Sequence, residues 1–277
     1  MTSSDLLLSR AKAPKSAGTV LIEPRVRPFQ QWWALVGRGI SQVLRGGEAI
    51  FAFVSPAMLA ICFYVPLRSI VEIGPGINYG QFLMPIIILQ SVNFAASSAA
   101  MRAAFDGVQG INTRFRVMPM SPAIPMLART ATNAFLLAIS LTCAAVACLL
   151  IDWRPGGGLW GTIGLFGLGA LVGALFSWVA DGIGLVAGSP EATSQALALP
   201  TLILGMMSTG FVPLSQFPEW IQPFVRNQPI SQFADSMRAL DTGTATFHQL
   251  LPSLLWCAGL AIVALVLLGV SVRRTRG

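Results

Sequence analysis

The sequence predicts an all-α, polytopic membrane protein. Charged residues make up only 10% of the chain and apolar residues 54%, whereas a soluble domain carries about 25% charged residues. After Arg45, six long stretches also lack Asp, Glu, Lys and Arg: 49–67, 73–101, 130–151, 155–180, 192–218 and 242–272. A helix needs roughly 20 apolar residues to cross a bilayer, and every stretch is near or above that length.

The first predicted elements lie ahead of these stretches. Residues 1–27 are rich in Ser, Pro, Lys and Arg without periodicity, which indicates a disordered cytoplasmic tail. In 28–46, apolar residues recur every three or four positions, at Phe29, Trp33, Val36, Ile40 and Val43. This pattern predicts an amphipathic helix on the membrane surface. A soluble helix packed on a partner protein is the alternative.

The rest of the chain, 47–277, is predicted to form one transmembrane domain. Its six spans lie at about 50–67, 80–101, 130–151, 159–180, 192–212 and 250–272. An even number of crossings puts both termini on one side, and that side then holds 14 of the 18 Lys and Arg residues. Basic residues stay in the cytoplasm. We therefore predict a multi-pass protein of the cytoplasmic (inner) membrane with both termini cytoplasmic.

Several classes of active site are incompatible with this sequence. A P-loop needs a lysine after its glycines, and the only lysines are Lys12 and Lys15 in the tail. The single histidine, His248, argues against a His-based triad or a multi-His metal site, and we interpret it as structural. The four cysteines fall inside predicted spans without metal-ligand spacing, and we interpret them as packing residues: Cys62, Cys143, Cys148 and Cys257. We expect no catalytic residue, metal or cofactor in this chain.

Ionisable residues are absent from the centres of the predicted spans. Arg102 and Asp181 sit at cytoplasmic span ends, from which their side chains could reach the interface. Intramembrane ionisable residues usually mark proton or ion pathways. Their absence argues against a proton-coupled transporter, and it favours a protein that takes energy from a partner or performs no active work.

Two connecting regions differ from ordinary loops. The cytoplasmic region 102–128 begins with helical spacing and ends in prolines, which favours a short helix parallel to the membrane that docks on a partner; a basic loop on anionic headgroups is the alternative. The outer region 211–248 is apolar yet broken by prolines, which favours short helices dipping into the outer leaflet. If Arg238 is buried there, Asp235 at i,i+3 spacing is its candidate partner; two solvated rim charges are the alternative.

A family resemblance rests on these two regions. Asp106, Gly110 and Pro119 match an acid–glycine–proline pattern, and the stretch GFVPLSQFPEWIQPFVRNQPISQFADSMRAL matches the outer segment of the same family. The chain resembles the permease subunits of type-2 ABC (ABC-2) exporters, in particular the daunorubicin/doxorubicin-resistance permeases of the DrrB type and their mycobacterial relatives. The resemblance covers about residues 28–272.

The resemblance implies an ABC-2 permease fold, in which six transmembrane helices accompany an amphipathic interfacial helix, a cytoplasmic coupling helix near 104–116 and an outer re-entrant hairpin. It implies an ATPase-coupling group formed by Asp106, Gly107, Gly110, Arg114, Arg116 and Pro119. It implies an outer gate formed by Pro213, Pro218, Trp220, Asn227, Pro229 and Arg238.

The same resemblance implies partners and cargo. A separate DrrA-like subunit would bind ATP and Mg, and a second permease would complete the pair, either DrrC-like or another copy of this chain. The cargo would be hydrophobic or amphipathic, as in an anthracycline-type drug or a complex lipid such as phthiocerol dimycocerosate. Membrane lipids are expected contacts, and nucleic acid is not.

Two other functions compete with export. One is a non-transporting scaffold that anchors a cytoplasmic ATPase, which the sequence leaves open. The other is a lipid-modifying membrane enzyme. Its candidate carboxylates on the outer side would be Asp152, Glu219, Asp235 and Asp241, which no histidine or metal cluster joins.

Overall fold

The structure, a computed structural model, describes residues 27–67, 79–118, 120–121 and 123–274. Its helices are α1 (Pro28–Arg45), α2 (Glu48–Leu67), α3 (Tyr79–Val108), α4 (Ile111–Val117), α5 (Ala123–Leu150), α6 (Gly158–Ala187), α7 (Pro190–Met206), η2 (Leu214–Gln216), α8 (Gln222–Asn227), α9 (Pro229–Asp241) and α10 (Phe247–Arg274). The described residues contain no strand. The predicted tail, except for Arg27, lies outside the described residues, as do Arg68 and Pro119.

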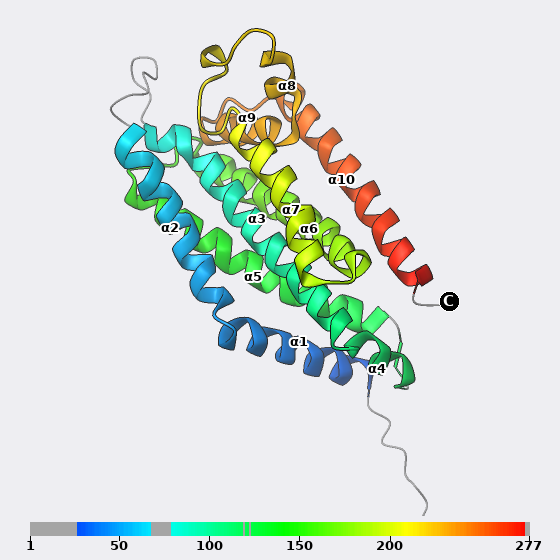
Figure 1. The fold of residues 1–277 in the computed structure, drawn as a ribbon. Helices are drawn as coiled ribbons and strands as arrows, with labels where there is room; N and C mark the ends of the chain where they lie inside the picture. Colours follow the sequence, from blue (N-terminus) through cyan, green and yellow to red (C-terminus); the bar gives the residue numbers. More distant parts are fainter. Residues whose placement is uncertain (1–26, 68–78, 119, 122, 275–277) are drawn as a thin grey trace, which may run out of the picture.

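The long helices form one bundle with a cap at each end (Figure 1). At one end α1 crosses beneath the bundle and α4 lies beside it; we call this the α1–α4 end. At the other end lie η2, α8 and α9; we call this the α8–α9 end. The chain passes from one end to the other along α2, α3, α5, α6, α7 and α10 in turn. Each of these helices therefore runs antiparallel to the one before it.

Five of these helices are long and apolar enough to cross a membrane: α2, α3, α5, α6 and α10. The predicted span 192–212 is different, because its helix, α7, has 17 residues and ends at Met206. Non-helical backbone follows through Pro213. At about 1.5 Å per residue α7 is about 25 Å long, and it still runs beside α3 and α6 between the two ends (Figure 1).

The third helix, α3, is the centre of the bundle, packed against α2, α5, α6, α7 and α9. Small residues let α6 approach it closely: a Cβ atom at Gly184 would collide with the carbonyl oxygen of Ala100 and crowd Ala103. Small residues at such crossings are typical of membrane helices, whose association depends on close packing. In contrast, α2 and α10 lie at the periphery and expose many large apolar side chains.

Two predictions about local structure need correction. The coupling helix was expected near 104–116, but residues 104–108 continue α3, and the separate helix α4 starts only at Ile111. Gly110 separates the two helices with a φ of +67°, a conformation that glycine adopts without a steric penalty. Cys62 was interpreted as packing, yet it is exposed on α2, unlike the buried Cys148 and Cys257.

Candidate functional site

A network of charged side chains joins four helices at the α1–α4 end. Arg102 of α3 forms an ion pair with Glu48 of α2 and donates a hydrogen bond of 2.8 Å to Asn133 of α5. Asn133 in turn donates to Asp181 of α6 at 3.3 Å, and Arg129 of α5 pairs with the same carboxylate at 3.1 Å. The network therefore ties α2, α3, α5 and α6 together.

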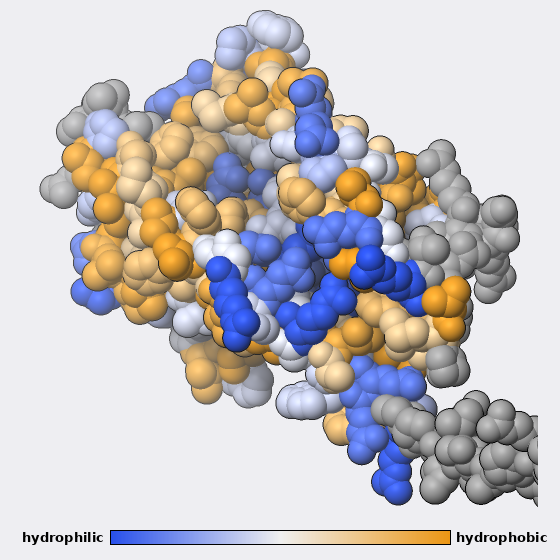
Figure 2. Space-filling view, turned by 60° about the horizontal axis from the view of Figure 1, so that its bottom comes forward, coloured by the Kyte–Doolittle hydropathy of each residue, from blue (hydrophilic) through white to orange (hydrophobic). Residues whose placement is uncertain are grey.

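A further ion pair adds the surface helix α1 to this group. Arg38 of α1 lies 3.7 Å from Asp106, one turn beyond Arg102 on α3. Three arginines thus pair with three carboxylates, and all of these residues except Glu48 line a small hollow of about 60 Å³ between α1, α3, α5 and α6. Figure 2 shows hydrophilic surface gathered on this end of the molecule, with hydrophobic surface around it.

Arg102 and Asp181, which the sequence places at span ends, are buried within this network. Their side chains are only 12% and 10% exposed. Removing one member of a buried pair costs about 3–5 kcal/mol, because the remaining charge is left without a partner. The network therefore holds the helix ends in a fixed arrangement.

The predicted coupling residues divide between the interior and the surface. The Asp106 side chain is 18% exposed and faces Arg38, whereas Arg114 is exposed on α4. Gly107 has open space around it, and Gly110 forms the break before α4. The side chain of Arg116 and the whole of Pro119 lie outside the described residues.

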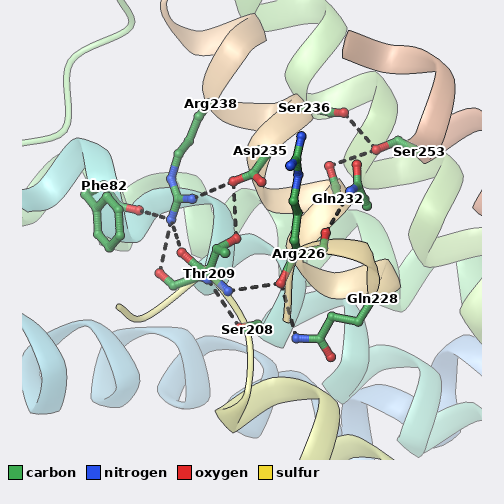
Figure 3. A network of polar contacts seen from close by, with 12 residues as sticks. Phe82, Ser208, Thr209, Arg226, Gln228, Gln232, Asp235, Ser236, Arg238 and Ser253 are labelled. Carbon is green, nitrogen blue, oxygen red and sulfur yellow. Dashed lines mark hydrogen bonds and ion pairs between the residues drawn. The ribbon is translucent and has the colours of Figure 1, made fainter. Parts of the chain in front are cut away.

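A second polar centre surrounds Arg238 at the α8–α9 end (Figure 3). Its guanidinium donates to the backbone oxygens of Phe82, Thr209 and Gly210 at 3.1, 2.8 and 3.3 Å, and to the carboxylate of Asp235 at 3.0 Å. It also lies 4.1 Å from the ring centre of Phe82. One side chain thereby connects α9 with α3 and with the segment after α7.

The Arg238 side chain is 21% exposed and that of Asp235 is 51% exposed. Burial lowers the pKa of Arg238 and raises the pKa of Asp235, because desolvation disfavours both charged forms, and the ion pair opposes both shifts. The pair therefore has the predicted i,i+3 geometry, with a mostly buried arginine and a half-exposed acid.

The irregular backbone after α7 makes further hydrogen bonds with Gln228, directly before α9, and with Ser231 of α9. The Ser231 hydroxyl accepts from the backbone nitrogen of Thr209 at 3.0 Å, and the Gln228 side chain donates to the carbonyl of Met207. Non-helical backbone at membrane depth requires such partners, because lipid supplies none. Together with Arg238, these side chains stabilise the break in the chain between α7 and η2.

The same helix is also bonded to α10. The hydroxyls of Ser236 and Ser253 lie 2.7 Å apart, and Ser253 donates to the carbonyl of Gln232 at 2.8 Å. Near them, the Trp256 indole donates to the carbonyl of Asn227 at 3.2 Å. Movement of α9 would therefore displace both α10 and the segment after α7.

The predicted outer-gate residues occupy different environments. Pro213 precedes η2, Pro218 follows it, Asn227 ends α8 and Pro229 begins α9. Trp220 is 81% exposed and far less enclosed than Arg238. Of this predicted set, the structure thus places Arg238 at the centre of a polar network and Trp220 on the surface.

Sequence reasoning missed most partners of both centres. At the α1–α4 end these are Arg38, Glu48, Arg129 and Asn133, and at the α8–α9 end Phe82, Thr209, Gln228 and Ser231. A signal existed for the first group, because acids and bases recur together at the ends of neighbouring apolar stretches. In the second group, Phe82 and Thr209 act through backbone carbonyls, which sequence does not distinguish, while Gln228 and Ser231 bond to the backbone after α7.

The fold and the two polar centres define a polytopic helical membrane protein whose described residues include no cluster of three or more potential metal ligands. Residues 63–270 match the family model described as ABC-2 family transporter protein. The chain therefore belongs to the ABC-2 family of transporter proteins.

Three relatives resemble the chain over much of its length. The doxorubicin resistance ABC transporter permease protein DrrB of Mycobacterium tuberculosis is 38% identical, covering 86% of this chain and 87% of the relative. The probable doxorubicin resistance permease protein DrrC of that organism is 23% identical, covering 81% of each chain. The daunorubicin resistance permease protein DrrB1 of Streptomyces coeruleorubidus is 27% identical, covering 68% of this chain and 65% of the relative.

Proposed function

We propose that this chain is the permease of an ATP-driven exporter that takes its energy from a separate ATP-binding subunit. Family membership and the names of the relatives support a permease of an ABC transporter. The observation that carries the coupling mechanism is the ion-pair network at the α1–α4 end. It ties the surface helix α1 to four transmembrane helices, so a displacement of α1 is transmitted to the bundle.

The docking surface for the ATP-binding subunit is assigned to α4 and the adjoining end of α3. Large apolar side chains are exposed there beside the basic Arg114, namely Phe105, Val108, Val117 and Met118. Exposed apolar groups beside charges are typical of protein interfaces. Asp106 acts behind this surface: it holds α1 against α3 instead of contacting the ATPase.

We assign the α1–α4 end to the cytoplasmic side of the inner membrane. Arginines gather at this end, including Arg38, Arg45, Arg102, Arg114 and Arg129, and basic residues are retained in the cytoplasm. Both termini are then cytoplasmic, because α1 begins and α10 ends at this side of the bundle (Figure 1).

The α8–α9 end then faces outward, and we assign the outer gate to it. Its gating element is α9, because Arg238 fastens this helix to α3 and to the segment after α7, while two serines fasten it to α10. For the gate to open, α9 must break these hydrogen bonds and form others. Trp220 serves instead as an anchor at the membrane surface.

The partners are a DrrA-like ATPase that holds ATP and Mg, and a second permease that is DrrC-like or a second copy of this chain. An anthracycline-type drug is the first cargo to examine, since the relatives are named for doxorubicin and daunorubicin resistance. A complex lipid such as phthiocerol dimycocerosate is the second.

The test is ATP-dependent transport in proteoliposomes that contain the permease with its ATPase and any second permease. Doxorubicin should move to the side away from the ATPase, and transport should stop when the ATPase lacks a functional P-loop lysine. A parallel assay follows extraction of the complex lipid to an acceptor. If the complex assembles and hydrolyses ATP but moves neither cargo, the chain is a scaffold and the exporter assignment is wrong.

A further inference from the structure

A pocket of about 230 Å³ lies between α3, α6 and α7, open to the surface beside α7 and separate from both polar centres. Faces of α3, α6 and α7 form its walls, and Ile230 of α9 and Leu260 of α10 complete them. The residues of α3 that line the pocket recur every three or four positions, as Ile86, Gln90 and Asn93 do, so they lie on one face of the helix. The pocket therefore contacts the helix that carries Arg238.

One wall of this pocket is polar and the rest is apolar. The polar wall consists of Gln90, Asn93 and Ser97 from α3, with Thr201 from α7. Thr201 donates to the Asn93 side-chain oxygen at 3.4 Å. Within the described part of the chain, the Gln90 amide and the Ser97 hydroxyl make no hydrogen bond. Polar groups in an apolar region gain stability when they find a partner, and a ligand can supply one.

The helix α7 carries a proline where it lines the pocket. Pro200 has no N–H group, so it cannot donate the usual helical bond to the carbonyl of Ala196, and both residues line the pocket. Gly205 widens the pocket further: a Cβ atom there would meet only the Gln90 amide, at 3.6 Å. The pocket thus combines space and apolar walls with the polar side chains of Gln90, Asn93, Ser97 and Thr201.

We propose that this pocket binds one apolar segment of the exported cargo, with hydroxyl or carbonyl groups along one edge that bond to Gln90, Asn93 and Ser97. Drug-sized ligands occupy pockets of about 300–1,000 Å³, while benzene fits an engineered cavity of about 150 Å³. The volume therefore suits a fused-ring segment and not a whole drug. This inference rests on the proposed function and names a cargo site within this single chain.

The first test measures doxorubicin binding without ATP to the intact complex in nanodiscs, from the change in the fluorescence of the drug. The double variant Gln90→Leu/Asn93→Leu keeps the approximate side-chain volume and removes the polar groups. We expect the dissociation constant to rise about tenfold, as for the loss of one to two hydrogen bonds. Ser97→Ala should weaken binding about threefold, while Ser98→Ala, its neighbour outside the pocket lining, should leave it unchanged.

The second test fills the pocket. Gly205→Met projects a flexible apolar side chain into it, and we expect at least a tenfold loss of doxorubicin affinity. Gly167→Met on α6 is the matched control, because Gly167 also has open space around it and does not line the pocket. If Gly205→Met does not assemble, the double variant at Gln90 and Asn93 decides the question.

The outcomes separate this inference from the proposed function. Binding that falls in the pocket variants and persists in the controls supports the site, even if the wild-type complex transports nothing. Binding and ATP-driven transport that are both unchanged in the pocket variants overturn the site and leave the exporter assignment intact. Equal losses in the pocket variants and in their controls also overturn the site.

Discussion

The sharpest test of the outer centre is the replacement of Arg238 by Met, which keeps an unbranched chain and removes the guanidinium. Three carbonyl oxygens then lose a donor, those of Phe82, Thr209 and Gly210. Each buried group left without a partner costs about 1–3 kcal/mol. The pair with the half-exposed Asp235 contributes at most about 1 kcal/mol. All three oxygens accept from one nitrogen, Nη2, which carries two N–H groups, so about two bonds are lost and we expect a loss of at least about 2 kcal/mol.

The assay is thermal unfolding of the permease in nanodiscs. At about 2–4 °C per kcal/mol for a chain of this size, Arg238→Met should lower the midpoint by at least about 4 °C. The exposed Arg226 on α8 supplies the control, and Arg226→Met should change the midpoint by less than about 2 °C. Adding Asp235→Ala should not rescue the Arg238 variant, since the orphaned carbonyls remain. A midpoint equal to that of Arg226→Met, or full rescue by the second change, would refute this reasoning.

Three further predictions concern orientation, coupling and packing. Single cysteines at Gln109 and Thr242 in a cysteine-free background should differ in intact cells: an impermeant thiol reagent should label only Thr242Cys, and labelling at Gln109Cys would reverse the proposed orientation. Gly110→Pro should permit membrane insertion and abolish transport, because proline cannot adopt a φ of +67°; normal transport would remove this break from the mechanism. Gly184→Ala should destabilise the bundle by about 1–3 kcal/mol through collision with α3, while Gly167→Ala should not; equal unfolding midpoints for the two would show that α6 and α3 are not tightly packed there.

Charge-free stretches predicted the helical membrane fold well because five of them contain long apolar helices. The helix that contains the second predicted span extends beyond the predicted end for a physical reason. The prediction ended it before Arg102, the first charged residue, whereas the structure continues α3 to Val108. The charge of Arg102 is neutralised by an ion pair with Glu48, and that of Asp106 by an ion pair with Arg38. The helix can therefore continue past both charged residues although neither is fully solvated.

The candidate site was predictable only in part. The sequence singled out Arg238 and named Asp235, at i,i+3 spacing, as its candidate partner. In the structure the two side chains lie 3.0 Å apart. Its other partners are backbone oxygens, one of them 156 positions away in sequence. These partners depend on where α7 ends and on how α9 folds back against it, and the pattern of side chains in the sequence predicts neither. The pocket at Asn93 was equally hidden, because a row of polar residues on one helix fits packing as well as ligand binding.

We propose above all that ATP hydrolysis by the partner subunit displaces helices at the α1–α4 end, and that the ion pairs there transmit this displacement to the transmembrane helices. The most direct measurement compares doxorubicin transport and ATPase activity of the whole complex after exchange of the charges of Arg38 and Asp106. Each single change, Arg38→Asp or Asp106→Arg, should leave ATP hydrolysis active and reduce transport, because like charges then face each other across 3.7 Å. The double exchange should restore most of the transport. Wild-type transport in both single variants, with normal expression, would contradict the account.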